Sequence, residues 1–192
     1  MDLYAERDAF LKRAIALGQK WDTPRELELF RFVDPRFCSA ADIVSGNGGL
    51  HASGRWNLHG AMRISYTAVE PETALAEALA NARYYQLPLS TALPRVLVSL
   101  ILRATRVLDL RNSACRRELG ISLNVITGTD WRRSNQEGIE AVTQAWGQAF
   151  ATAGFEALIV SSAAADGTSV MIFPDNMQRS SEFFVQREVV IS

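Results

Sequence analysis

The chain has 192 residues, of which 48% are apolar and 21% are charged, so it can bury one sizeable core and is neither disordered nor fibrous. Its formal net charge of −1 excludes a general basic field that would attract nucleic acid or an anionic membrane surface. Any anionic ligand must therefore be bound by a local arrangement of side chains.

The first part of the chain predicts a helix and then a strand. Residues 4–20 place apolar side chains at roughly helical spacing and end at Gly18. Residues 27–33 alternate bulky apolar side chains with charged ones, which is typical of a half-buried strand, and the pattern stops at Asp34-Pro35. We expect the domain proper to begin at this strand.

The next segment predicts a loop, a strand and a helix. Residues 45–60 are rich in glycine and are expected to form a loop. Residues 64–68 read as a short strand. Glu70-Pro71-Glu72 then opens a helix, because proline suits the first helical position and acidic side chains suit the positive end of the helix dipole.

The remaining elements indicate a mixed architecture. Residues 95–110 are rich in valine, leucine and isoleucine with little alternation, as expected for a strand pair or a long strand buried on both faces at the centre of a sheet. Residues 135–153 predict a second amphipathic helix ended by Gly154. Strand-like runs follow at residues 157–160, 169–173 and 183–191. Strands surround the helices without regular alternation, which predicts a single α+β domain.

Cysteine usage and the absence of targeting signals favour a cytoplasmic protein. Cys38 and Cys115 are far apart and match neither a disulfide framework nor a metal site. The N-terminus carries charges of both signs without an apolar signal core, and the longest apolar run, near residues 96–102, is too short to span a bilayer. We expect no metal, no membrane and no direct nucleic-acid partner.

One segment carries a chemical pattern. Gly54-Arg55-Trp56-Asn57-Leu58-His59-Gly60 is followed by Tyr66 and Glu77, so that the Arg, Tyr and Glu are spaced by equal intervals of eleven residues. Singly, each residue also fits a plain structural role: a salt-bridge arginine, a strand aromatic or a solvated helix glutamate. The joint occurrence makes coincidence a weaker explanation.

This pattern resembles the RES family, which has a Gly-x-Arg-Trp-Asn-x-x-Gly loop, a tyrosine at the end of the next strand and a glutamate inside the following helix. The resemblance runs from about residue 29 to the C-terminus and adds Arg31, Trp131, residues 143–147 and residues 160–163. It assigns residues 26–192 to the RES domain and leaves residues 1–25 as an N-terminal accessory helix. It also implies an ADP-ribosyltransferase-like fold, with mixed or antiparallel sheets flanked by helices.

The resemblance further implies an enzyme that degrades NAD and acts as a toxin restrained by an Xre-type antitoxin. It maps the catalytic residues to Arg55, Tyr66, Glu77 and Ser162, with Ser161 as the alternative serine. It points to an NAD-binding set made of Arg31, Arg55, Trp56, Asn57 and Tyr66.

Cleavage of the nicotinamide–ribose bond builds positive charge on the ribose, which a carboxylate such as Glu77 can stabilise. The Arg55 guanidinium suits the pyrophosphate, with Arg31 as a second contact, and Tyr66 offers an aromatic face to the nicotinamide. NAD is then a substrate and no cofactor is needed.

The pattern leaves several alternatives open. The acceptor is water in a glycohydrolase, or inorganic phosphate as co-substrate in a phosphorylase. Transfer of ADP-ribose to a protein target uses the same donor geometry, and a non-catalytic NAD-binding module would bind without turnover. A homo-oligomer and a toxin–antitoxin hetero-oligomer are both compatible with the sequence.

Overall fold

The computed structural model describes the backbone of residues 1–191 and the side chains of residues 1–187. Its strands are β1 (Arg25–Val33), β2 (Ser65–Ala68), β3 (Arg95–Ala104), β4 (Val107–Asp109), β5 (Ala157–Ser161), β6 (Thr168–Ile172) and β7 (Glu182–Ile191). Its α-helices are α1 (Arg7–Ala16), α2 (Ala40–Ser45), α3 (Gly48–His51), α4 (Pro71–Tyr84), α5 (Ser113–Leu119), α6 (Leu123–Gly128), α7 (Trp131–Gln136) and α8 (Val142–Thr152). Short 3₁₀ helices are η1 (Pro35–Phe37), η2 (Leu89–Ala92) and η3 (Pro174–Asn176).

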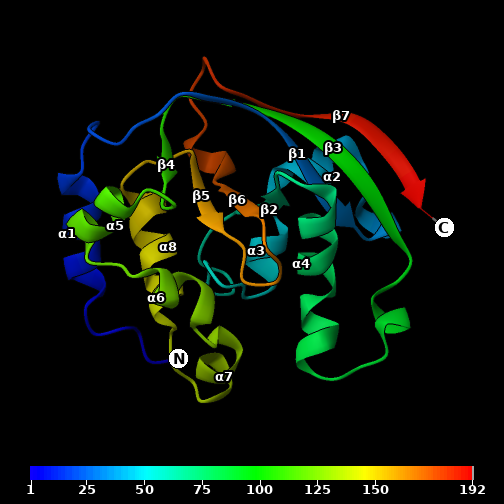
Figure 1. Ribbon diagram of the computed structural model, residues 1–192, viewed down its shortest axis with the longest axis horizontal. Helices are drawn as coiled ribbons and strands as arrows, with labels where there is room; N and C mark the ends of the chain where they lie inside the picture. Colours follow the sequence, from blue (N-terminus) through cyan, green and yellow to red (C-terminus); the bar gives the residue numbers. More distant parts are fainter. Residues whose placement is uncertain (192) are drawn as a thin grey trace.

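The strands form one seven-stranded sheet in the order β4-β5-β6-β2-β1-β3-β7. β4 and β5 are parallel, whereas every other neighbouring pair is antiparallel, so the sheet is mixed. The sheet is open, with β4 and β7 as its two edge strands. Figure 1 shows the long strands β1, β3 and β7 arching over one end of the molecule, while β5, β6 and β2 lie between α8 and α4.

Strand β6 is buried along its whole length because apolar groups cover both of its faces. Met171 belongs to a cluster that also contains Trp146 and Phe150 of α8. Val170 belongs to a second cluster that contains Leu29 of β1. Because successive side chains of a strand point to opposite faces, the central strands divide the core into these two clusters.

Helix α4 is fixed to the sheet at its N-terminal end. Pro71 occupies its first turn, where a missing backbone N–H has no cost. Glu70, the residue before it, accepts a hydrogen bond from the backbone N–H of Thr168 at 2.9 Å. A Cβ atom at Gly167 would overlap the side chain of Thr73, so glycine permits the close approach. The contact places the middle of α4 beside the first residues of β6.

The N-terminal helix packs on the same core as the rest of the chain. Phe10 of α1 is 4% exposed, and its ring stacks on Trp146 of α8 with the ring centroids 4.0 Å apart. The division into residues 1–25 and residues 26–192 stays a prediction. Within the part of the chain that the structure describes, no helix is both long and apolar enough to cross a membrane.

The α+β class and the single domain with a mixed sheet flanked by helices are confirmed. The N-terminal helix, the strand at residues 27–33, the strand at 64–68, the helix from Pro71 and the three C-terminal strands are all present.

Two predictions are wrong, one about the extent of a helix and one about the place of a strand in the sheet. The single helix predicted at residues 135–153 is instead α7 and α8, separated by a turn in which Gly138 has a φ of 78°. The run at residues 95–110 is not the centre of the sheet, because β3 lies next to the edge strand β7 and β4 forms the other edge. Along β3, buried and less buried side chains alternate, so an apolar run here covers one protected face and one partly open face.

Helical turns also appear where none was predicted. Within the expected loop at residues 45–60, residues 48–51 form the one-turn helix α3. Helices α5 and α6 are capped by the residues before them, Asn112 and Ser122, whose side chains accept hydrogen bonds from backbone N–H groups in the first turn of each helix. Both helices are too short for an apolar period to reveal them in the sequence.

Candidate active site

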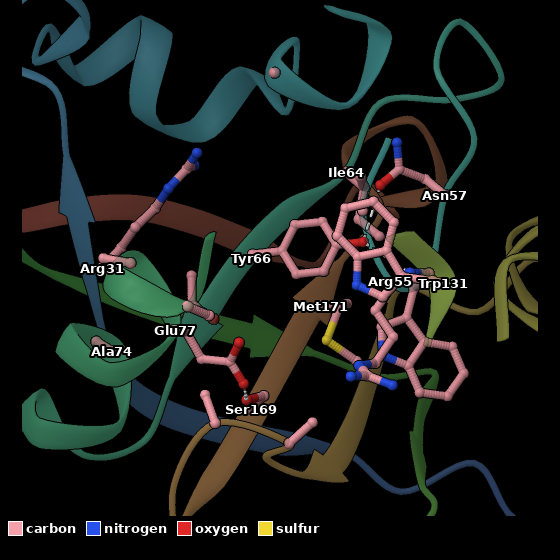
Figure 2. A pocket seen from close by; sticks show the side chains of 18 of the residues that line it. Arg31, Arg55, Asn57, Ile64, Tyr66, Ala74, Glu77, Trp131, Ser169 and Met171 are labelled. Carbon is pink, nitrogen blue, oxygen red and sulfur yellow. Dashed lines mark hydrogen bonds between the residues drawn. The ribbon is translucent and has the colours of Figure 1, made fainter. Parts of the chain in front are cut away.

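A cavity of about 750 Å³ opens on one face of the sheet, between α4 on one side and residues 52–57 with the start of α7 on the other. This volume lies in the range of small-molecule binding sites. Figure 2 shows Glu77 on α4 at one side and Arg55 at the other, with Tyr66 and Met171 between them. Tyr66 on β2 pairs with Met171 on β6, so the two strands form the floor.

Glu77 is held by two serine hydroxyls from the β5–β6 hairpin. Its Oε1 accepts hydrogen bonds from Ser162 Oγ at 2.6 Å and from Ser169 Oγ at 3.1 Å. Among the described residues, nothing hydrogen-bonds to Oε2, and the side chain lines the cavity. One carboxylate oxygen is therefore oriented by the fold while the other is open to a ligand.

The hydroxyl of Ser162 uses all of its hydrogen-bonding positions within the protein. Its oxygen accepts hydrogen bonds from the backbone N–H groups of Ala164 and Ala165, at 3.0 and 3.3 Å. The two acceptor positions of the hydroxyl are thereby used, and its proton is donated to Glu77. Ser162 is only 7% exposed, so its geometry suits orientation of the carboxylate rather than nucleophilic attack. Ser161, the alternative serine, ends β5 and lines the cavity without a hydrogen bond to Glu77.

Tyr66 locks the loop that precedes it. Its hydroxyl accepts a hydrogen bond from the backbone N–H of Trp56 and donates one to Asn57 Oδ1, both at 2.9 Å. A Cβ atom at Gly54 would lie 2.5 Å from the same hydroxyl, so the loop needs glycine there. Burial raises the pKa of the Tyr66 phenol, which keeps it a hydrogen-bond donor at neutral pH. The ring wall faces the cavity while the hydroxyl faces the loop.

Trp56 and Asn57 support the loop from within the core, because each is 1% exposed. Asn57 Nδ2 donates to the carbonyls of Gly49, Ala52 and Leu58. Both side chains border the cavity, but the side-chain amide of Asn57 is used by the protein itself.

Helix α8 holds the same loop from the other side. Gln144 Nε2 donates to the carbonyl oxygens of Gly54 at 2.9 Å and Asn57 at 3.2 Å. A Cβ atom at Gly147 would overlap the carbonyl oxygen of Trp56, so the helix packs directly on the loop backbone. The loop that carries Arg55 is therefore a rigid part of the wall.

Arg55 is half-buried and has one arm anchored. Its Nη1 donates to the carbonyl oxygens of Ile126 at 3.3 Å and Thr129 at 2.8 Å, at the C-terminal end of α6. Burial lowers the pKa of Arg55, and the nearby Glu77 carboxylate raises it. Within the described residues, its Nε and Nη2 have no hydrogen-bond partner, so they can bind an anion in the cavity.

Arg31 borders the cavity from β1 but points toward α2. Its Nη1 donates to the carbonyl oxygen of Ile43 at 3.0 Å and to Ser65 Oγ at 3.4 Å. Figure 2 shows its guanidinium pointing away from Glu77 and Arg55. Burial lowers the pKa of Arg31, and the charge of Arg95 lowers it further. Arg31 therefore lies at the edge of the cavity, on a different wall from Arg55.

The structure thus brings Arg55, Tyr66 and Glu77 around one cavity, with Ser162 behind Glu77 and Arg31 at the margin. Sequence reasoning missed Ser169, which reaches Glu77 from β6, and the bracing role of Gln144. Ser169 lies two residues before Met171 on the same strand face, so the alternation of β6 was the available signal. Among the described residues, no group of three or more His, Cys, Asp or Glu side chains is placed to hold a metal ion.

Comparison with known proteins adds two findings. The family model described as the RES domain matches residues 28–189. The fold is similar to a chain in the crystal structure of the M. tuberculosis MbcT-MbcA toxin-antitoxin complex, with a TM-score of 0.75 and 20% sequence identity. The superposition covers 96% of this chain and 93% of that chain. Comparison with curated protein sequences finds no match.

Proposed function

This chain belongs to the RES-domain family, and from that premise we propose that it cleaves the nicotinamide–ribose bond of NAD. The observation that carries the proposal is the state of Glu77, whose Oε1 is fixed by two serine hydroxyls while Oε2 is open to the cavity. A carboxylate held in this way is ready to oppose positive charge without reorganising during the reaction.

The bond-breaking step follows from that geometry. As the bond from ribose C1′ to the nicotinamide nitrogen breaks, its electron pair passes to the nicotinamide, which leaves as a neutral molecule. Positive charge then develops on C1′ and the ring oxygen, and Glu77 stabilises it. An acceptor oxygen forms the new bond to C1′. Water as acceptor gives ADP-ribose. Inorganic phosphate as acceptor gives ADP-ribose phosphorylated at this same ribose carbon. In both cases the acceptor's proton passes to solvent.

Other residues of the cavity bind and orient the dinucleotide. The free nitrogens of Arg55 suit the pyrophosphate, since a guanidinium can contact two phosphate oxygens at once. The Tyr66 ring offers an apolar wall for the nicotinamide. The Nη1 of Arg31 is bonded to the carbonyl oxygen of Ile43. Arg31 can therefore contact the substrate through its other nitrogens, or through Nη1 once that hydrogen bond is broken.

The direct test follows the products of NAD during incubation with the purified chain, in buffers with and without inorganic phosphate. We expect nicotinamide release in at least one buffer, with the second product identifying the acceptor. Labelled NAD that instead marks a protein would indicate ADP-ribosyl transfer. NAD that binds but remains intact in all buffers would contradict the proposal and leave a binding module.

We also propose that the activity makes the chain a toxin neutralised by an Xre-type antitoxin, with NAD depletion as the harmful event. The support is the similarity to a chain of a toxin–antitoxin complex, together with the family. Expression in a host without the antitoxin should arrest growth and lower NAD, whereas the Glu77→Gln variant should do neither. Growth arrest by both forms would show that harm does not depend on this site.

A further inference from the structure

A second guanidinium lies in the wall of the cavity, at the start of α7. The Cζ atom of Arg132 is 4.5 Å from the ring centroid of Trp131 and 5.0 Å from that of Tyr84. Its Nε donates to Asn81 Oδ1 of α4 at 3.2 Å. Two aromatic faces and one hydrogen bond therefore fix the position of this side chain. Tyr84, Trp131 and Arg132 all line the cavity.

The terminal nitrogens of Arg132 remain free. Within the described residues they make neither a hydrogen bond nor an ion pair. The adjacent carboxylate, Asp130, is instead used by the Tyr84 hydroxyl, at 2.9 and 3.0 Å, and by the backbone N–H of Arg133. Arg133 itself points away and pairs with Glu137 at 2.9 Å. Because its position is fixed and its terminal nitrogens are unpaired among the described residues, Arg132 can bind the anionic group of a ligand.

Arg132 and Arg55 act on the same space. The carbonyl oxygen that anchors Arg55 belongs to Thr129, three residues before Arg132. Figure 2 shows Trp131 next to Arg55 on one side of the cavity. Burial is the main cause that lowers the pKa of Arg55. The Glu77 carboxylate raises this pKa, and the positive charge of Arg132 lowers it. Two positive charges held this close repel each other until an anion binds between them.

We propose that Arg55 and Arg132 form a two-arginine clamp for a diphosphate, so that the cavity selects nucleotides with two linked phosphates over those with one. The inference rests on the proposed function and adds the residue that holds the second phosphate. Each guanidinium binds one phosphate, and the Tyr84–Arg132–Trp131 stack sets the distance between them. Inorganic phosphate as co-substrate is the competing source of the same oxyanion chemistry.

The test measures binding by the full chain with calorimetry. The ligands are ADP-ribose, which has both phosphates but no scissile bond, and ribose 5-phosphate, which has one. The variants are Arg132→Gln, which removes the charge, and Arg132→Lys, which keeps the charge without the fork. Arg133→Gln is the matched control, since it removes a neighbouring arginine that faces solvent. Thermal melts establish that each variant is folded.

We expect Arg132→Gln to raise the Kd for ADP-ribose about 10- to 100-fold, the effect of losing charge-assisted hydrogen bonds. Arg132→Lys should give a smaller increase, and the Kd for ribose 5-phosphate should change less than about threefold. Arg133→Gln should bind both ligands as the unchanged chain does.

Three results would overturn the clamp. Equal affinity of Arg132→Gln and the unchanged chain for ADP-ribose would overturn the clamp but would not contradict the proposed cleavage of NAD. An unchanged ADP-ribose Kd with a raised KM for phosphate would assign Arg132 to the acceptor instead. Failure of the unchanged chain both to bind ADP-ribose and to release nicotinamide would remove the proposed function together with the clamp.

Discussion

Replacing Tyr66 with phenylalanine should destabilise the protein although the ring is kept. The change removes the hydroxyl that bridges the Trp56 N–H and Asn57 Oδ1, each at 2.9 Å. Both residues are 1% exposed, so water cannot readily replace the lost partner. Leaving two buried polar groups unpaired at about 1–3 kcal/mol each predicts a loss of about 2–6 kcal/mol in the free energy of unfolding. For a chain of this length that corresponds to a fall in Tm of roughly 4–24 °C.

Urea unfolding measures the free energy, and nicotinamide release at low temperature measures activity of the folded variant. Tyr85→Phe is the control, because its hydroxyl accepts a bond from Gln136 on the surface and the residue is 45% exposed. It should cost less than about 0.5 kcal/mol. A Tyr66→Phe variant of unchanged stability but with activity lost would refute the locking role and place the hydroxyl on the substrate.

Three further outcomes are expected. Ser169→Ala removes one of two hydrogen bonds to Glu77 and should lower kcat about 3- to 10-fold with little change in the Kd for ADP-ribose; an unchanged kcat would exclude an orienting role. Gly147→Ala should cost more than about 3 kcal/mol in urea unfolding, since its Cβ would overlap the carbonyl oxygen of Trp56, and a small loss would contradict that packing. Cys115 is 1% exposed and burial raises the pKa of its thiol to about 11, so at pH 8 a thiol reagent should label one cysteine in the folded chain and two in urea; labelling of both in the folded chain would contradict the burial of Cys115.

Local signals in the sequence predicted most elements of the fold. Pro71 and the acidic residues beside it marked the start of α4, and the alternation at residues 27–33 marked β1. The order of strands was not predictable, because β3 is equally apolar whether it lies in the middle of a sheet or beside its edge. The break at Gly138 was overlooked because residues 135–137 are polar side chains that also fit the solvent face of a helix, so only the positive φ of Gly138 reveals the turn between α7 and α8.

The same contrast applies to the site. Arg55, Tyr66 and Glu77 lie on adjacent elements, so their spacing carried the information needed to group them. Ser169 and Arg132 join them only through strand pairing and the packing of α7 against α4, which link residues more than fifty positions apart. The alternation of β6 places Ser169 on the same strand face as Met171, but its contact with Glu77, like that of Arg132 with α4, depends on the tertiary structure.

The central claim is that Glu77 stabilises charge on the ribose as the nicotinamide leaves. Its most direct test is the single-turnover rate of nicotinamide release from NAD, with the enzyme in excess, for the unchanged chain and for Glu77→Gln. Glutamine keeps the size and still accepts from both serines, and Glu72→Gln, an exposed change in the first turn of the same helix, is the control. We predict a fall of at least about 10²-fold for Glu77→Gln and none for Glu72→Gln. Equal rates for Glu77→Gln and the unchanged chain would contradict the account.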